Sequence, residues 1–113
     1  ENAESTGTRQ LSGIGGQMDF LEGAYRSKGG KGFICINSSR VTKDGERKSN
    51  ILATIPGGST ISAPRTMIQY VATEYGIASL SGKTLRERAE AMASIAHPDF
   101  REELMKYAQE NFK

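Results

Sequence analysis

Glycine divides the first part of this chain into short segments. The sequence holds 13 glycines among its 113 residues, and three of them fall between Ser12 and Phe20. Glycine adopts backbone angles that are closed to other residues, and it lets a ligand approach the main chain closely. Apolar residues recur at helical spacing directly after this glycine loop. The pattern predicts a short helix over residues 17–26, ended by Gly29-Gly30.

Three apolar runs in the middle of the chain predict strands, at residues 32–36, 51–55 and 68–73. An Asp44-Gly45 turn signal lies between the first two runs, and Pro56 ends the second. We therefore expect the middle of the chain to consist of short strands and turns.

The end of the sequence predicts two helices. Thr84 and Glu87 have the spacing of a capping box, in which the threonine caps the helix start and the glutamate reaches back to it. Pro98 follows His97 and suits the first position of the last helix. Strands followed by helices around a glycine loop predict an α/β fold.

Length and composition exclude several classes of protein. A chain of 113 residues forms one small domain with a thin core, or a piece of a larger one. No apolar run approaches the ~20 residues of a membrane-spanning helix. The acidic start at Glu1 is unlike a signal peptide, and because it is not a methionine we expect a piece of a longer chain. A net charge of +2 does not by itself indicate nucleic acid.

Cys35 is the only cysteine of the sequence. A single cysteine excludes an intramolecular disulfide framework and a multi-cysteine zinc site, and it favours a reducing compartment such as the cytoplasm. Because Cys35 lies in an apolar run, we expect a buried and unreactive thiol. His97 has no serine or cysteine partner at a readable spacing, which favours a structural role in a turn. We predict no metal site.

The glycine loop has two possible roles. A Gly-Gly pair at the start of a helix leaves unpaired N–H groups beside the positive end of the helix dipole, and such a site binds phosphate or stabilises an oxyanion. The alternative is a tight turn that happens to be rich in glycine. The loop is not a Walker A motif, because no Lys-Ser/Thr pair follows it. Met18 also stands where the last glycine of the dinucleotide fingerprint would be.

Two further features each allow two interpretations. Between Arg26 and Lys48 there are seven basic residues and two acidic ones. They form either a solvated surface or a cradle for a polyphosphate ligand. Glu74 ends an apolar run, where a strand simply reaches the surface or where an α/β sheet binds its ligand.

Five stretches of the sequence carry a resemblance to a known family. They run in order through nearly the whole chain: Glu4–Gln10, Ser12–Phe20, Thr73–Ala78, Gly82–Glu90 and Ile95–Arg101. Together they resemble the C-terminal part of the acetyl-CoA hydrolase/transferase family, and are most similar to its butyryl-CoA:acetate and 4-hydroxybutyrate CoA-transferases. The resemblance implies an open α/β sheet with helices packed on it, ending in two helices.

The family implies covalent catalysis. A glutamate carboxylate attacks an acyl-CoA thioester and forms an acyl-glutamyl anhydride, which the CoA thiolate then converts to a glutamyl-CoA thioester. An incoming carboxylic acid reverses the sequence and leaves as the new acyl-CoA. The nucleophilic glutamate belongs to a motif upstream of the glycine loop, and nothing in residues 1–113 matches it. The resemblance thus implies the C-terminal portion of a catalytic domain, inactive without its upstream half.

By the same resemblance, the catalytic residues of this portion are Gly16 and Glu74. The N–H of Gly16 would donate to the developing oxyanion and contact CoA. Glu74 matches a second glutamate, which orients the nucleophile or the carboxylate substrate.

The remaining site residues bind the substrate or support the loop. Binding of CoA and substrate is implied for Gly15, Gly16, Gln17 and Lys43. The lysine lies within a turn, residues 41–48, that is longer here than in the family. Asp19 and Phe20 would support the loop, with Phe20 anchoring its helix in the core.

We therefore predict an enzyme that moves CoA between butyryl- or 4-hydroxybutyryl-CoA and acetate, with a CoA thioester as substrate and no permanently bound cofactor. One alternative is an acyl-CoA hydrolase of the same family, in which water is the acceptor. Another is a non-catalytic CoA-binding or interaction module. The expected partners are the acyl-CoA, the short-chain carboxylate, the missing N-terminal part and a second copy in a homo-oligomer. We expect neither nucleic acid nor a membrane as partner.

Overall fold

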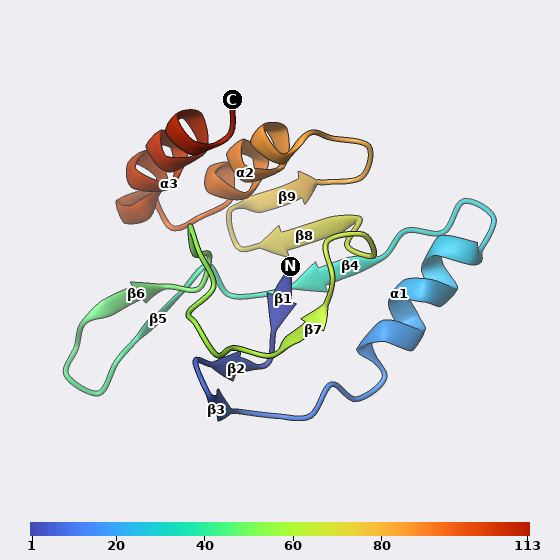
Figure 1. Ribbon diagram of the computed structural model, residues 1–113, viewed down its shortest axis with the longest axis horizontal. Coiled ribbons are helices and arrows are strands. Elements are labelled where there is room, and N and C mark those ends of the chain that lie inside the picture. The colour runs from blue at the N-terminus through green and yellow to red at the C-terminus, as the bar shows by residue number, and fades with distance from the viewer. The chain divides into compact units, whose positions relative to one another are not determined.

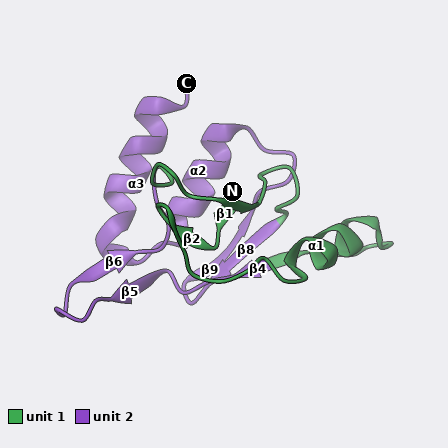
Figure 2. Cartoon of the chain, turned by 60° about the horizontal axis from the view of Figure 1, so that its bottom comes forward, with its two compact units in different colours: residues 1–33, 54–69 green, residues 34–53, 70–113 purple.

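The computed structural model describes residues 1–113, and these form two compact units. Unit 1 contains residues 1–33 and 54–69, and unit 2 contains residues 34–53 and 70–113 (Figure 2).

Unit 1 consists of one helix and two pairs of very short strands (Figure 1). Its elements are β1 (Asn2–Ala3), β2 (Ser5–Thr6), β3 (Arg9–Gln10), α1 (Gln17–Arg26) and β7 (Ile61–Ala63). β1 pairs with β7 and β2 pairs with β3, both in antiparallel fashion. The predicted helix over residues 17–26 is confirmed with the same bounds.

The buried face of α1 is centred on Leu21, which is 4% exposed. Phe20 is 82% exposed, so the prediction that Phe20 anchors the helix in the core is wrong for this chain. Neighbouring helix residues differ by roughly 100° in direction, and with Leu21 pointing inward the phenylalanine side chain points to solvent.

Unit 2 contains a three-stranded sheet, a hairpin and two helices (Figure 1). Its elements are β4 (Phe33–Cys35, which begins at the boundary of the units), β5 (Ser39–Val41), β6 (Arg47–Ser49), β8 (Tyr70–Thr73), β9 (Gly76–Ser79), α2 (Leu85–Ser94) and α3 (Pro98–Asn111). Helix α2 packs against β9, and α3 packs against α2. The combination of small sheets with three helices agrees with the predicted α/β class.

The three-stranded sheet has the order β4-β8-β9. β8 and β9 form an antiparallel hairpin, whereas β4 and β8 point in the same direction (Figure 1). Just beyond β4, the N–H of Ile36 donates to the carbonyl of Ala72 at 3.0 Å. The carboxyl ends of these two strands therefore meet at one edge of the sheet.

The predicted burial of Cys35 is wrong, because the thiol is exposed. In β4 only the middle residue, Ile34, is buried, and Phe33 and Cys35 point to the other side. Alternate residues of a strand face opposite sides of the sheet. The apolar run belongs to an edge strand with one covered face, not to a strand that is buried on both.

The predicted strand over residues 51–55 does not form, although Ile51 is buried. The hydroxyl of Ser49 donates to the carbonyl of Ile51 at 2.6 Å and accepts from its N–H at 3.2 Å. A serine side chain that bonds both backbone groups of a nearby residue competes with a strand ladder. β6 consequently ends at Ser49.

Both predicted helix starts in unit 2 are confirmed. Thr84 accepts from the N–H of Glu87, and the Glu87 carboxylate accepts from the N–H of Thr84 at 2.8 Å. The bond from the Thr84 N–H, and next the one that the Thr84 hydroxyl donates to the same carboxylate at 2.8 Å, lower the pKa of Glu87. At the second start, His97 Nδ1 accepts from the N–H of Asp99 at 3.2 Å, and Pro98 is the first helical residue. The structural role predicted for His97 is thus confirmed.

The longest of the three helices has 14 residues. No helix of the chain has both the length and the apolar character that crossing a membrane requires.

We predict that Thr84→Ala destabilises the chain by about 1 kcal/mol, because an N-cap side chain satisfies one of the free N–H groups at the helix start. Urea unfolding followed by circular dichroism measures the change. Ser81→Ala, an exposed position before the helix, is the matched control. Equal stability of the two variants would contradict the capping role.

Candidate functional site

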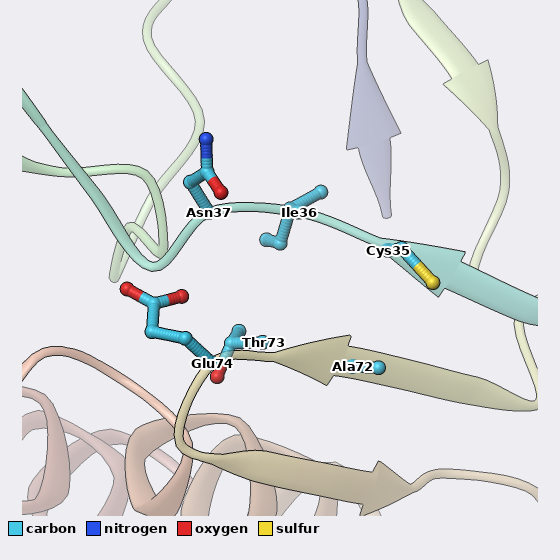
Figure 3. Close-up of a pocket in the computed structure, with 6 residues that line it drawn as sticks. All are labelled: Cys35, Ile36, Asn37, Ala72, Thr73 and Glu74. Carbon is cyan, nitrogen blue, oxygen red and sulfur yellow. The ribbon is translucent and has the colours of Figure 1, made fainter.

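An open cavity lies at the carboxyl ends of β4 and β8 (Figure 3). Its volume is about 400 Å³, and it is lined by Cys35, Ile36, Asn37, Ala72, Thr73 and Glu74. Ligands of α/β sheets commonly bind at the carboxyl ends of the strands. The cavity is therefore the candidate site of unit 2, and Glu74 is the one acidic residue that lines it.

Both oxygens of the Glu74 carboxylate are held by one residue, Ser38. The Ser38 hydroxyl donates to Oε1 at 2.5 Å, and the Ser38 N–H donates to Oε2 at 2.9 Å. Hydrogen bonds to a charged form stabilise that form. The hydroxyl of Ser38, and next its N–H, lower the pKa of the Glu74 carboxyl; the charge of His97 contributes less. Glu74 is an ionised carboxylate at neutral pH.

The backbone around Glu74 is also fixed. The Thr73 hydroxyl donates to the carbonyl of Ile95 at 2.6 Å and accepts from the N–H of Tyr75 at 3.1 Å. Glu74 and Tyr75 form the two-residue turn between β8 and β9, and Gly76 completes it with a φ of +150°, which favours glycine.

The ring of Tyr75 ties this turn to the start of α3. It packs edge-on against the His97 ring, with centroids 5.8 Å apart. The guanidinium of Arg101 lies 4.9 Å from the centre of the Tyr75 ring, close enough for a cation–π interaction.

Asn50 holds the segment that carries Ser38. Its N–H donates to the carbonyl of Ser38, and its side-chain amide donates to the carbonyl of Asn37, both at 2.9 Å. Arg40 Nη1 donates to the Asn50 side-chain oxygen at 2.6 Å. The base of the β5–β6 hairpin thus positions Ser38 beside the Glu74 carboxylate.

The sequence analysis missed Ser38 and Asn50, and the polar run directly after β4 was the only available signal.

The glycine loop lies in unit 1, at the start of α1. Gly15 has a φ of +53°, and Gly16 is the N-cap with a φ of −91°. No side chain caps this helix, and the Gly16 N–H has no acceptor within the chain. The loop therefore presents an open N–H group beside the positive end of a helix dipole.

The other predicted loop residues surround this helix start. Gln17 accepts a long bond, 3.4 Å, from the Asn2 side chain, and its N–H donates to the carbonyl of Ile14 at 3.3 Å. Asp19 lies in the first turn of α1 and is exposed. A side chain at Gly16 would make ordinary contacts with the Phe20 ring, at 3.6 Å, and with the Asp19 carboxylate, at 4.0 Å.

Lys43 lies in the exposed turn of the β5–β6 hairpin, which Gly45 closes with a φ of +82°. The basic stretch divides between the units: Arg26, Lys28 and Lys31 belong to unit 1, and Arg40, Lys43, Arg47 and Lys48 to the hairpin in unit 2. A cradle for a polyphosphate stays a prediction. The structure brings together no three histidine, cysteine, aspartate or glutamate side chains that could hold a metal ion.

The sequence profile of the acetyl-CoA hydrolase/transferase C-terminal domain matches residues 1–108. The chain belongs to this family. It is 48% identical over 108 residues to the butyryl-CoA:acetate CoA-transferase of Anaerostipes caccae. It is 47% identical over 110 residues to the 4-hydroxybutyrate coenzyme A transferase of Clostridium kluyveri.

A solved structure agrees with the sequence comparison. The crystal structure of RipA from Yersinia pestis superposes with a TM-score of 0.76 at 39% identity, covering 92% of this chain and 22% of that one. The two transferases are covered to 24% and 25% of their lengths, and this chain to 96% and 97%. The chain thus spans about a quarter of the curated relatives that it matches.

We predict that Gly76→Ala destabilises the chain by about 1–3 kcal/mol, because a side chain is strained at this backbone conformation. The new methyl group itself would fit, since its nearest neighbour is Ile95 Cγ2 at 3.6 Å. Urea unfolding tests the change. Gly57→Ala, with open space around it and no positive φ, should be neutral or stabilising; an equally small effect at Gly76 would contradict the strain argument.

Proposed function

We propose that this chain is the C-terminal part of a CoA-transferase. The whole enzyme would move CoA between a short-chain acyl-CoA, such as butyryl- or 4-hydroxybutyryl-CoA, and acetate through a glutamyl-CoA thioester. The proposal is supported by the family and by relatives that are named for these transfers. The nucleophilic glutamate would come from an N-terminal part of the protein, because no segment of this chain resembles its motif.

The observation that carries the proposal is the open N–H of Gly16 at the start of α1. When a carboxylate attacks a thioester, negative charge develops on the carbonyl oxygen, and a preorganised N–H donor stabilises that charge. Gly15 reaches its left-handed conformation without strain and leaves the space over the loop open. Gln17 would support the loop through its bond with Asn2.

Glu74 would take part in the same reaction as an ordered carboxylate that forms no covalent bond with the substrate. Its two oxygens each accept one bond from Ser38 and retain capacity for a further donor from the cavity. Lys43, exposed at the hairpin tip, would attract the negative charge of CoA. We further propose that the whole enzyme is a homo-oligomer, as the family resemblance implies, and that it is cytoplasmic, as the single cysteine favours.

We predict that Gly16→Ala in the whole protein lowers the transfer of CoA from butyryl-CoA to acetate by about 100-fold. The added methyl group would crowd the thioester at the N–H, and a misplacement of roughly 1 Å at the reacting centre has that effect. The fold should survive, because the added methyl group makes only ordinary contacts. The measurement is kcat for transfer, with circular dichroism as the check on folding.

Gly23→Ala is the matched control for this experiment. It places the same methyl group within α1, at an exposed position with open space around it. It should leave turnover unchanged. Normal turnover of Gly16→Ala would contradict the role of the loop.

The family profile includes hydrolases as well as transferases, and hydrolysis is therefore the second candidate function. A transferase should release butyrate from butyryl-CoA only as acetyl-CoA forms, in equal amounts, and should need acetate. Product analysis with and without acetate distinguishes the two. Release of free CoA at full rate without acetate would favour the hydrolase.

A further inference from the structure

Ser38 is fully buried, at 0% exposed, yet it directs both of its donors to the side chain of an exposed residue, Glu74. Most side-chain hydrogen bonds of proteins go to backbone groups or water, and a buried serine hydroxyl is easily satisfied by a carbonyl. The bonds keep the buried donors of Ser38 paired and so contribute to stability, but they also fix a side chain that lines the cavity. A carbonyl acceptor would provide the first effect without the second.

We propose that Ser38 is a positioning residue of the active site, which fixes the Glu74 carboxylate at the cavity as an oriented hydrogen-bond acceptor. This inference rests on the proposed function, because it assigns Glu74 to the transfer reaction. Ser38 does not line the cavity, so it acts through Glu74 and not on the substrate.

The geometry supports this role from two directions. The carboxylate is held by two donors from one rigid segment, which Asn50 in turn fixes through two backbone carbonyls. The peptide of Glu74 is fixed by the bonds of Thr73 to Ile95 and Tyr75. A flexible glutamate side chain is thus restrained at both ends before any ligand arrives, which is what a precise site requires.

The charged and titratable groups on the surrounding elements do not provide this orientation. They are Cys35 on β4, Tyr75 in the same turn, His97 before α3 and Arg101 on α3. Of these, His97 acts on Glu74 only through its charge, as the smallest of the factors that lower the pKa of the carboxyl. Arg101 lies over the ring of Tyr75. Apart from the backbone N–H of Glu74 itself, which ranks below both bonds from Ser38 in lowering the pKa of the carboxyl, only Ser38 donates to this side chain.

The test is a double-mutant cycle in the whole protein with Ser38→Ala, Glu74→Gln and the combination, assayed for CoA transfer from butyryl-CoA to acetate. We expect Ser38→Ala to lower kcat by about 10- to 100-fold with little change in KM. The double variant should be no slower than Glu74→Gln alone, because the serine acts through the glutamate.

A second readout, the pKa of Glu74, can be measured without turnover. Carbon-13 labelling of glutamate carboxyls, with the Glu74 signal assigned by its loss in Glu74→Gln, gives the pKa of Glu74 by NMR titration. The bonds from Ser38 lower this pKa, so Ser38→Ala should raise it. The acid limb of the kcat/KM profile should then move to higher pH, since less of the carboxyl is ionised at a given mildly acidic pH.

Ser39→Ala is the matched control, because its hydroxyl accepts from Arg47 Nη1 at 2.9 Å and its loss touches no bond of Glu74. It should keep the turnover and the Glu74 pKa of the wild type. Additive losses in the cycle, full turnover of Glu74→Gln, or an unchanged Glu74 pKa in Ser38→Ala would each overturn the inference. If the wild type transfers no CoA, the proposed function fails, and the titration then tests only the contact: a raised pKa shows that Ser38 holds the Glu74 carboxylate, and an unchanged one overturns the inference.

Discussion

The pairing of β4 with β8 is the contact on which the site of unit 2 depends. The two strands are separated by more than thirty residues of sequence, and they lie side by side in the same direction (Figure 1). Their carboxyl ends therefore open at one edge of the sheet, where the cavity lies. The bond from the Ile36 N–H to the Ala72 carbonyl sets the register between the two segments. Ser38 and Glu74 each lie two residues further along, and this register brings them within hydrogen-bonding distance.

The support of this edge comes from three elements that do not themselves line the cavity. The β5–β6 hairpin fixes Ser38 through Asn50. The Thr73 hydroxyl donates to the carbonyl of Ile95 at the end of α2. His97, at the start of α3, packs on Tyr75. A carboxylate held in this way loses little further freedom when a ligand binds, and the long, mobile side chain of glutamate otherwise has much freedom to lose. The bonds of Ser38 and Thr73 thus restrain a flexible side chain before a ligand binds.

Local sequence signals predicted the elements whose formation is decided locally. The helical spacing gave the bounds of α1, the Thr84–Glu87 pair gave the start of α2, and Pro98 gave the start of α3. The predictions failed where a neighbour distant in sequence decides the outcome. Cys35 is exposed because β4 is an edge strand, and Phe20 is exposed because the covered face of α1 is centred on Leu21. Glu74 was singled out by its place at a strand end, but Ser38 could not be, since only the pairing of β4 with β8 makes it a neighbour.

The two candidate groups of this chain have opposite electrostatic character, and this limits how one reaction can use both. The open N–H of Gly16 favours growing negative charge, whereas the ionised Glu74 opposes it. Two negative charges in direct contact repel each other. Direct contact between the ionised Glu74 and a second carboxylate, whether nucleophile or substrate, is therefore disfavoured at neutral pH unless the two share a proton. In the proposed transfer, Glu74 would act through a donor group between the two carboxylates, or on an N–H or O–H group of the substrate, and the oxyanion would be left to the glycine loop. A carboxylate kept ionised by Ser38 is suited to this role and unsuited to that of a general acid.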